Sequence, residues 1–272
     1  MDTHRLTPDR YVSLLRSEST RFAALLSQAE PTAPVPSCPD WDAADLLWHL
    51  TEVQWFWATI AGERLRDPSG LGERRPPRPP AYADLLTQFA QTTAKLADAL
   101  ADADDAEPAY TWLPGEQTVG FIRRRQAHEV LIHRVDAELV VGEPTGLDPE
   151  LASDGVDEAL QIMFGGIPGW ATFTRQHGPV AVRAIDTGAR WLVDVGAQSG
   201  TSPESGEHVT EPTLDVRADQ LGDAPAAVAE ITAAAGPLDS WLWGRADSTA
   251  VDTDGDRAAI AALEAVIGGG ID

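Results

Sequence analysis

The chain has 272 residues, with 43 acidic against 20 basic side chains and a formal net charge of −23 at pH 7. Nucleic acids and anionic membranes are bound by clustered Lys and Arg, so a chain this acidic is not expected to bind either of them. Apolar residues make up 43% of the sequence, which is enough to build the core of one large domain or of two modest ones.

Neither a membrane segment nor a disulfide is expected. No stretch approaches the roughly 18–20 uncharged apolar residues that a membrane helix needs. The polar residues 1–10 lack the apolar core of a signal peptide. Cys38 is the single cysteine, so no internal disulfide can form. We therefore expect a cytoplasmic protein that is a monomer or a weak homo-oligomer.

The first half of the chain carries apolar residues at helical spacing in four segments of about 20 residues. Asp42 stands at the start of the second segment as a candidate N-cap residue, and Asp45 falls in the first turn after it. Pro-rich stretches before and after this segment predict an extended connection and a loop. Four such helices predict a helix bundle. The expected helices cover about residues 7–28, 42–64, 82–103 and 118–141.

The pattern changes after residues 143–146, which we take as a domain boundary. One further helix is expected there, and apolar residues then alternate with polar ones, as is typical of strands. The sequence therefore predicts an α+β protein with a helix bundle at residues 1–145 and a small α+β domain at 146–272. The expected strands are 180–184, 190–195 and 213–217, and the expected helices are 150–164, 225–235, 238–243 and 257–267.

Glu129 and His133 are four residues apart in the last helix of the bundle. This spacing stacks their side chains on one face, where a carboxylate and an imidazole can share a metal ion. A third ligand must come from elsewhere, and His49 is the best candidate. It lies in an apolar helical stretch, where a buried imidazole without a polar partner would be costly. The alternative is a helix-stabilising Glu–His pair worth a few tenths of a kcal/mol.

Two carboxylates are placed to orient these ligands. Asp45 precedes His49 by four residues, and Asp136 follows His133 by three. Either can hold an imidazole by a hydrogen bond or can be exposed to solvent. His128 precedes His133 by five residues, about 140° around a helix, so these two should not share an ion.

Two histidines and a carboxylate with an open fourth position suit Zn²⁺. Ni²⁺, Fe²⁺ and Mn²⁺ are also compatible with these ligand types.

Two blocks of sequence carry a resemblance to a known family. Residues 35–50 are similar to a Cys-Pro-x-Trp-x-x-x-Asp-Leu-x-x-His-Leu pattern, and residues 124–138 to an Arg-x-x-His-Glu-x-x-x-His-x-x-Asp-Ala block. Residues 241–245, Trp-Leu-Trp-Gly-Arg, are a weaker match. The chain resembles the mycothiol-dependent maleylpyruvate isomerase family, within the wider group of DinB-like metalloproteins.

The resemblance implies a DinB-like four-helix bundle that holds zinc through His49, Glu129 and His133, followed by a smaller α+β domain. It also implies the low-molecular-weight thiol mycothiol as a co-substrate. Zinc would hold this thiol as the nucleophilic thiolate, which adds to a double bond of a small electrophile. Rotation and elimination then give isomerisation, whereas retention of the adduct gives S-transfer. An arginine from the second domain suits a substrate carboxylate, and Arg245 is the candidate, although it can equally be an exposed turn residue.

Other functions and roles stay open at this point. The bundle can belong to a non-enzymatic metal- or ligand-binding stress or regulatory protein. It can also be a zinc hydrolase with an activated water, such as a thiol-conjugate amidase. Cys38 is expected to be a buried structural thiol, because no base or cationic group stands clearly beside it. Most of the nine tryptophans are expected in the core, with one or two lining a pocket.

Overall fold

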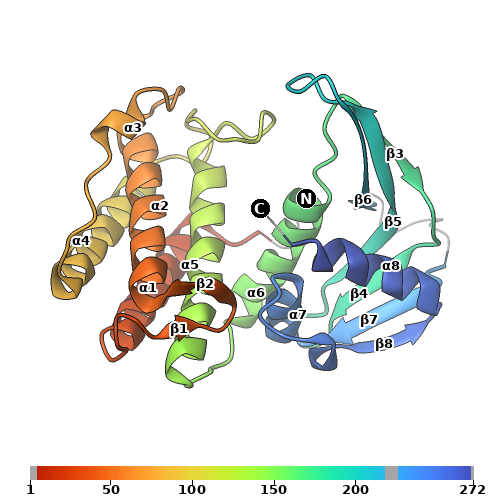
Figure 1. The fold of residues 1–272 in the computed structure, drawn as a ribbon. Helices are drawn as coiled ribbons and strands as arrows, with labels where there is room; N and C mark the ends of the chain where they lie inside the picture. The colour runs from red at the N-terminus through yellow and green to blue at the C-terminus, as the bar shows by residue number, and fades with distance from the viewer. Residues whose placement is uncertain (1–4, 218–225, 271–272) are drawn as a thin grey trace. The chain divides into compact units, whose positions relative to one another are not determined.

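The computed structural model describes residues 5–217 and 226–270. The chain divides into two compact units, a helical one made of Leu6–Gly146 and a second that begins at Leu147. Helices dominate the first unit and a mixed sheet lies in the second, so the predicted α+β class is confirmed (Figure 1). None of the helices in the described ranges has the length and hydropathy needed to cross a bilayer.

The helical unit is built from four long helices, and all four expected segments form them. The helix α1 packs on α5 and α4, and α2 packs on α4 and α5. Their apolar faces enclose a core that includes Phe22, Leu50 and Phe89. A short helix α3 (Leu71–Arg74) interrupts the predicted loop after α2. The long helices are α1 (Pro8–Leu26), α2 (Ala43–Glu63), α4 (Tyr82–Ala101) and α5 (Val119–Val141).

Helix caps decide where these helices begin. The Asp42 carboxylate accepts a hydrogen bond from the backbone N–H of Asp45, and the Asp45 carboxylate accepts one from the backbone N–H of Asp42. This reciprocal capping box confirms the predicted N-cap of α2. Thr118 caps α5 by accepting from the backbone N–H of Phe121. The helix α5 ends at Gly142, whose φ of 74° lies in the left-handed region that favours glycine.

Removing the α2 cap is expected to weaken the helical unit measurably. Asp42→Ala leaves the Asp45 backbone N–H without its partner, so the free energy of unfolding should fall by about 1 kcal/mol. Urea denaturation followed by circular dichroism measures this loss. Asp40→Ala removes the same charge from an exposed side chain two residues earlier and should change stability little. Equal losses of unfolding free energy in the two variants would contradict the capping role of Asp42.

A short hairpin fills the connection between α1 and α2. Its strands β1 (Pro34–Val35) and β2 (Cys38–Asp42) pair antiparallel. Val35 is buried in the core of the helical unit, and β2 runs directly into the cap of α2. The Pro-rich connection is therefore extended, as predicted, and fixed at both ends.

The second unit folds around a mixed sheet. The strand order is β3-β5-β4-β7-β8, with β6 paired to β5, and β4 and β7 run parallel while the other pairs are antiparallel. Trp191 is fully buried in its core, and its indole N–H donates to Asp157 at 2.9 Å. The strands are β3 (Ala171–Arg175), β4 (Val180–Ala184), β5 (Arg190–Thr201), β6 (His208–Val216), β7 (Ala229–Ala233) and β8 (Asp252–Gly255). The helices are α6 (Pro149–Glu158), a π-helical continuation (Ala159–Phe164), α7 (Ala235–Leu242), a 3₁₀ turn (Ser248–Ala250) and α8 (Arg257–Gly268).

The helix predicted at residues 225–235 is wrong. Its first residue lies outside the described ranges, and β7 occupies half of the remainder. Ala229, Ile231 and Ala233 are buried on alternate positions, which is the period of a strand. The alanines favour a helix locally, but pairing with β4 and β8 and burial of this face override that preference.

Candidate metal site

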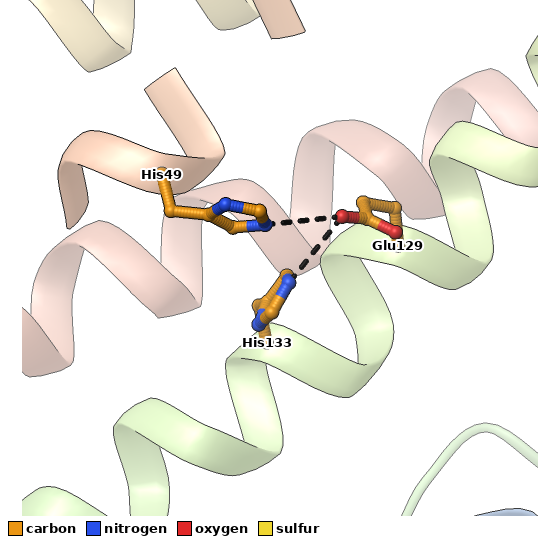
Figure 2. A group of neighbouring side chains, drawn as sticks. All are labelled: His49, Glu129 and His133. Carbon is orange, nitrogen blue, oxygen red and sulfur yellow. Dashed lines mark ion pairs between the residues drawn. The ribbon is translucent and has the colours of Figure 1, made fainter. Parts of the chain in front are cut away.

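The three predicted ligands come together between two helices of the helical unit. His49 projects from α2, and Glu129 and His133 project from successive turns of α5 (Figure 2). Ligand atoms of the three side chains lie within 4.8 Å of one another. Glu129 Oε1 is 3.5 Å from His49 Nε2 and 3.3 Å from His133 Nε2. Two nitrogen atoms and one oxygen atom therefore face a common point.

The site is open to solvent on the side of α2. The His49 side chain is 34% exposed, whereas Glu129 and His133 are 17% and 10% exposed. The expectation that His49 is buried in an apolar stretch is therefore wrong. Its helix is apolar on most sides, but this turn lies at the edge of the core, where the Trp41 ring covers His49 at 4.7 Å between centroids.

Asp136 orients the ring of His133. Its Oδ2 lies 2.8 Å from His133 Nδ1, and its side chain is fully buried. A carboxylate can only accept a hydrogen bond, so Nδ1 carries the proton and donates it. This leaves His133 Nε2 directed at Glu129, as a metal ligand requires. Asp136 therefore contacts the imidazole of His133, as its position in the sequence predicts.

Arg125 holds the other oxygen of Glu129. Its Nη2 donates to Glu129 Oε2 at 2.5 Å, one helical turn before the carboxylate. Burial raises the pKa of Glu129, but Arg125, followed by His133 and His49, outweighs it and holds the pKa well below its usual range. Glu129 is therefore a charged ligand with one oxygen restrained. Arg125 was not among the residues predicted from the sequence, although its i, i+4 spacing to Glu129 could have indicated it.

Metal affinity is expected to rise with pH because of His133. Burial lowers the pKa of this imidazole, but the hydrogen bonds that it donates to Asp136 and Glu129 outweigh burial and raise the pKa to about 9. The pKa of His133 is higher in the folded protein than its unfolded value of 6.5, so protonation of His133 stabilises the metal-free fold. This contribution is fully present below pH 6.5 and is lost as pH rises through about 9. A metal must displace that proton, so affinity should rise about tenfold per pH unit below 9.

Competition with a chelator of known affinity measures this dependence between pH 6.5 and 9. Calorimetry in two buffers should also show that about one proton is released for each metal ion bound. A pH-independent affinity would show that His133 is not a ligand.

Comparison with known proteins bears on the same residues. The family model of the mycothiol maleylpyruvate isomerase N-terminal domain matches residues 12–138. The match spans most of the helical unit. The resemblance predicted from the sequence blocks is thereby confirmed, and the matched range contains all three predicted ligands.

Two solved structures share the fold of the chain. They are crystal structures of a mycothiol-dependent maleylpyruvate isomerase and of its histidine-to-alanine variant, each with a TM-score of 0.58. The sequence identities are 13% and 11%, and each alignment covers 92% of this chain and 95% of that chain. At such identities the likeness establishes a shared fold along nearly the whole chain. Comparison with curated protein sequences finds no match.

Asp45 is not found to contact His49. Its carboxylate accepts from the backbone N–H of Asp42 at 3.3 Å and from Arg78 Nη1 at 2.6 Å. The Arg78 guanidinium lowers the pKa of Asp45. The Asp45 carboxylate is thus engaged in the capping box of α2 and in an ion pair with Arg78.

Three further residues singled out from the sequence lie apart from the ligand atoms or in the second unit. His128 is buried on α5 with its ring 6.3 Å from that of Tyr11, outside the three-residue cluster, as its spacing predicts. Cys38 is only half-buried in β2, so its expected full burial is wrong. Arg245 follows α7 in the second unit and donates to the carbonyl oxygen of Trp243 at 2.7 Å. Its role toward a substrate carboxylate stays a prediction.

Proposed function

We propose that this chain is a metal- and thiol-dependent enzyme that acts on a small electrophile, as an isomerase or an S-transferase, with mycothiol as the thiol. The observation that carries this proposal is the convergence of His49, Glu129 and His133 on one point that is open to solvent. The match of residues 12–138 to the mycothiol maleylpyruvate isomerase N-terminal domain supports the choice of thiol.

The residues present fit a divalent ion of borderline character, and zinc is the metal that we propose. Two imidazole nitrogens and one carboxylate oxygen are a common ligand set of catalytic zinc, which keeps a fourth position for water or substrate. When bound there, the metal would lower the pKa of a thiol and keep it as the nucleophilic thiolate. The exposed side of His49 is where such a molecule can enter.

The protein's own side chains would hold the ligands in one arrangement. Asp136 keeps His133 Nε2 turned toward the common point, and Arg125 restrains Glu129 Oε2 so that Oε1 faces the two imidazoles. The charge of Glu129 is balanced in part by Arg125, which favours an entering thiolate over a neutral thiol. Pre-orientation of this kind is what a binding site for a small charged group needs.

Arg245 of the second unit is our proposed ligand for a carboxylate on the electrophile. A guanidinium matches a carboxylate with two parallel hydrogen bonds, which the ammonium of lysine cannot do. The electrophile itself is expected to be small. We propose that the chain acts in the cytoplasm, where low-molecular-weight thiols are kept reduced.

A thermal-shift experiment with three thiols tests this function. Zinc-loaded and chelator-treated protein are each heated with mycothiol, glutathione or bacillithiol. We expect mycothiol to stabilise the zinc-loaded protein, by about 2.7 kcal/mol at a concentration 100-fold above its dissociation constant. Chelator-treated protein and the Glu129→Gln variant should show no shift. If no thiol stabilises the zinc-loaded protein, thiol dependence is wrong, and hydrolysis by metal-bound water becomes the better account.

A further inference from the structure

We propose that the β1–β2 hairpin is a positioning element of the metal site, in which Ser37 fixes the His133 ring through Asp136 and Trp41 restrains the His49 ring. This inference rests on the proposed function, because it concerns how the same ligands are held. It adds two residues from a segment that contributes no ligand atom.

The first connection runs through hydrogen bonds. Ser37, in the turn between the two strands, donates its hydroxyl to Asp136 Oδ1 at 2.5 Å. The other oxygen of Asp136 lies 2.8 Å from His133 Nδ1. Both oxygens of a fully buried carboxylate are thus engaged, which sets its rotation about the Cβ–Cγ bond. The direction of His133 Nε2 therefore depends on the position of the Ser37 hydroxyl.

The second connection runs through ring contacts. The Trp41 ring in β2 lies 4.7 Å from the His49 ring and 6.3 Å from the His133 ring, between centroids. The two imidazoles are 4.8 Å apart and inclined at 72°. Because His49 is the most exposed ligand, solvent leaves its ring free to turn on one side. The indole occupies the other side and so restricts the rotamers that His49 can adopt.

The hairpin is itself held firmly enough to transmit these restraints. Val35 is buried in the core of the helical unit and pairs with Cys38 across the turn that carries Ser37. At the other end, Asp42 closes β2 and caps α2. A backbone hydrogen bond from Ala43 to the carbonyl oxygen of Ala33 at 2.9 Å closes the base of the hairpin. Ser37 and Trp41 are therefore fixed relative to both α2 and α5.

A purely structural role of Ser37 would lead to a different experimental result. If Ser37 only stabilised the fold, its loss would lower the unfolding temperature of the metal-free protein and leave the metal affinity of the folded protein unchanged. If it positions His133, the affinity and the metal's ligand geometry change in protein that is still folded. Threonine keeps the hydroxyl, so Ser37→Thr should restore most of what Ser37→Ala loses.

Cobalt binding to the full-length protein tests the proposal, with Co²⁺ affinity measured by chelator competition and its ligand geometry by visible absorption. We expect Ser37→Ala to bind Co²⁺ about tenfold more weakly than wild type and to alter the absorption bands. Ser37→Thr should lie close to wild type. Ser27→Ala, which removes an exposed hydroxyl that donates to the Ala24 carbonyl oxygen at the end of α1, should match wild type.

A second pair of variants keeps the test decisive if Ser37→Ala does not fold. Trp41→Ala should weaken Co²⁺ binding, and Trp41→Phe should restore part of the loss because a ring again faces His49. The proposal would be overturned if Ser37→Ala and Trp41→Ala both kept the wild-type Co²⁺ affinity and absorption spectrum. If Ser37→Ala is unfolded, wild-type affinity and spectrum in Trp41→Ala would overturn it. A wild-type protein that binds no Co²⁺ would instead overturn the proposed function itself.

Discussion

Glu129→Gln is expected to lower the divalent metal content of the purified protein from about one ion per chain to nearly none. The substitution replaces a charged ligand by a neutral amide of the same shape. It also removes the Glu129 carboxylate charge that pairs with the Arg125 guanidinium, whose side chain is only 5% exposed. The site then gains net positive charge beside two imidazoles, which opposes a cation. Elemental analysis after purification without a chelator or a metal-affinity column measures the content.

Glu143→Gln is the matched control. It makes the same chemical change on an exposed side chain just beyond the end of α5 and should leave the metal content unchanged. Metal retained in Glu129→Gln at the level of this control would show that Glu129 is no ligand. The pair on α5 would then be the ordinary helix-stabilising contact that its spacing also allows.

Arg134→Ala should cause the largest loss of stability in the helical unit, about 3–5 kcal/mol. The Arg134 guanidinium is 2% exposed and donates to Glu18 on α1 at 2.7 Å and to Thr145 at 3.0 Å. It also pairs with Glu138 at 2.9 Å, and the Glu138 side chain is equally buried. Arg21, which is 37% exposed, also pairs with Glu138, so removing Arg134 takes the buried one of these two arginine partners from a buried carboxylate. Losing a buried partner is the costly case for an ion pair. Urea unfolding gives the free-energy difference.

An exposed ion pair between α1 and α4 provides the comparison. Arg16 and Asp98 lie 2.6 Å apart with side chains 45% and 71% exposed, so Arg16→Ala should cost less than about 1 kcal/mol. Similar losses from the two substitutions would mean that burial does not set the strength of the Arg134 network. Arg134→Ala should keep its metal while folded, because its guanidinium contacts Glu18, Glu138 and Thr145, none of which is a proposed ligand.

The helical unit was predictable because its signals are local. Apolar residues recur at helical spacing through α1, α2, α4 and α5, and Asp42 supplies a cap that depends on residues three positions away. The pairing of Glu129 with His133 follows from one helical turn, which no tertiary contact needs to supply. The approach of His49 was a hypothesis, since it depends on how α2 packs against α5.

The parts that were not predicted depend on tertiary contacts. The strand β7 lies in an Ala-rich segment whose local preference is helical, and only its pairing with β4 and β8 makes it extended. Ser37 and Trp41 are far along the chain from His133, and no spacing rule connects a turn residue of a hairpin with a helix about 100 positions later. The exposure of His49 likewise reflects the edge of the core, which a run of apolar neighbours does not indicate.

X-ray absorption at the zinc edge tests the central claim most directly, because it identifies the atoms bound to the metal. We predict nitrogen and oxygen neighbours only in the zinc-loaded protein, and one added sulfur neighbour at about 2.3 Å after mycothiol is supplied. The sulfur should be absent from a sample treated with an S-methylated thiol, which cannot form a thiolate. Zinc that keeps its nitrogen and oxygen neighbours in the presence of excess mycothiol would contradict a thiol-binding metal site formed by His49, Glu129 and His133.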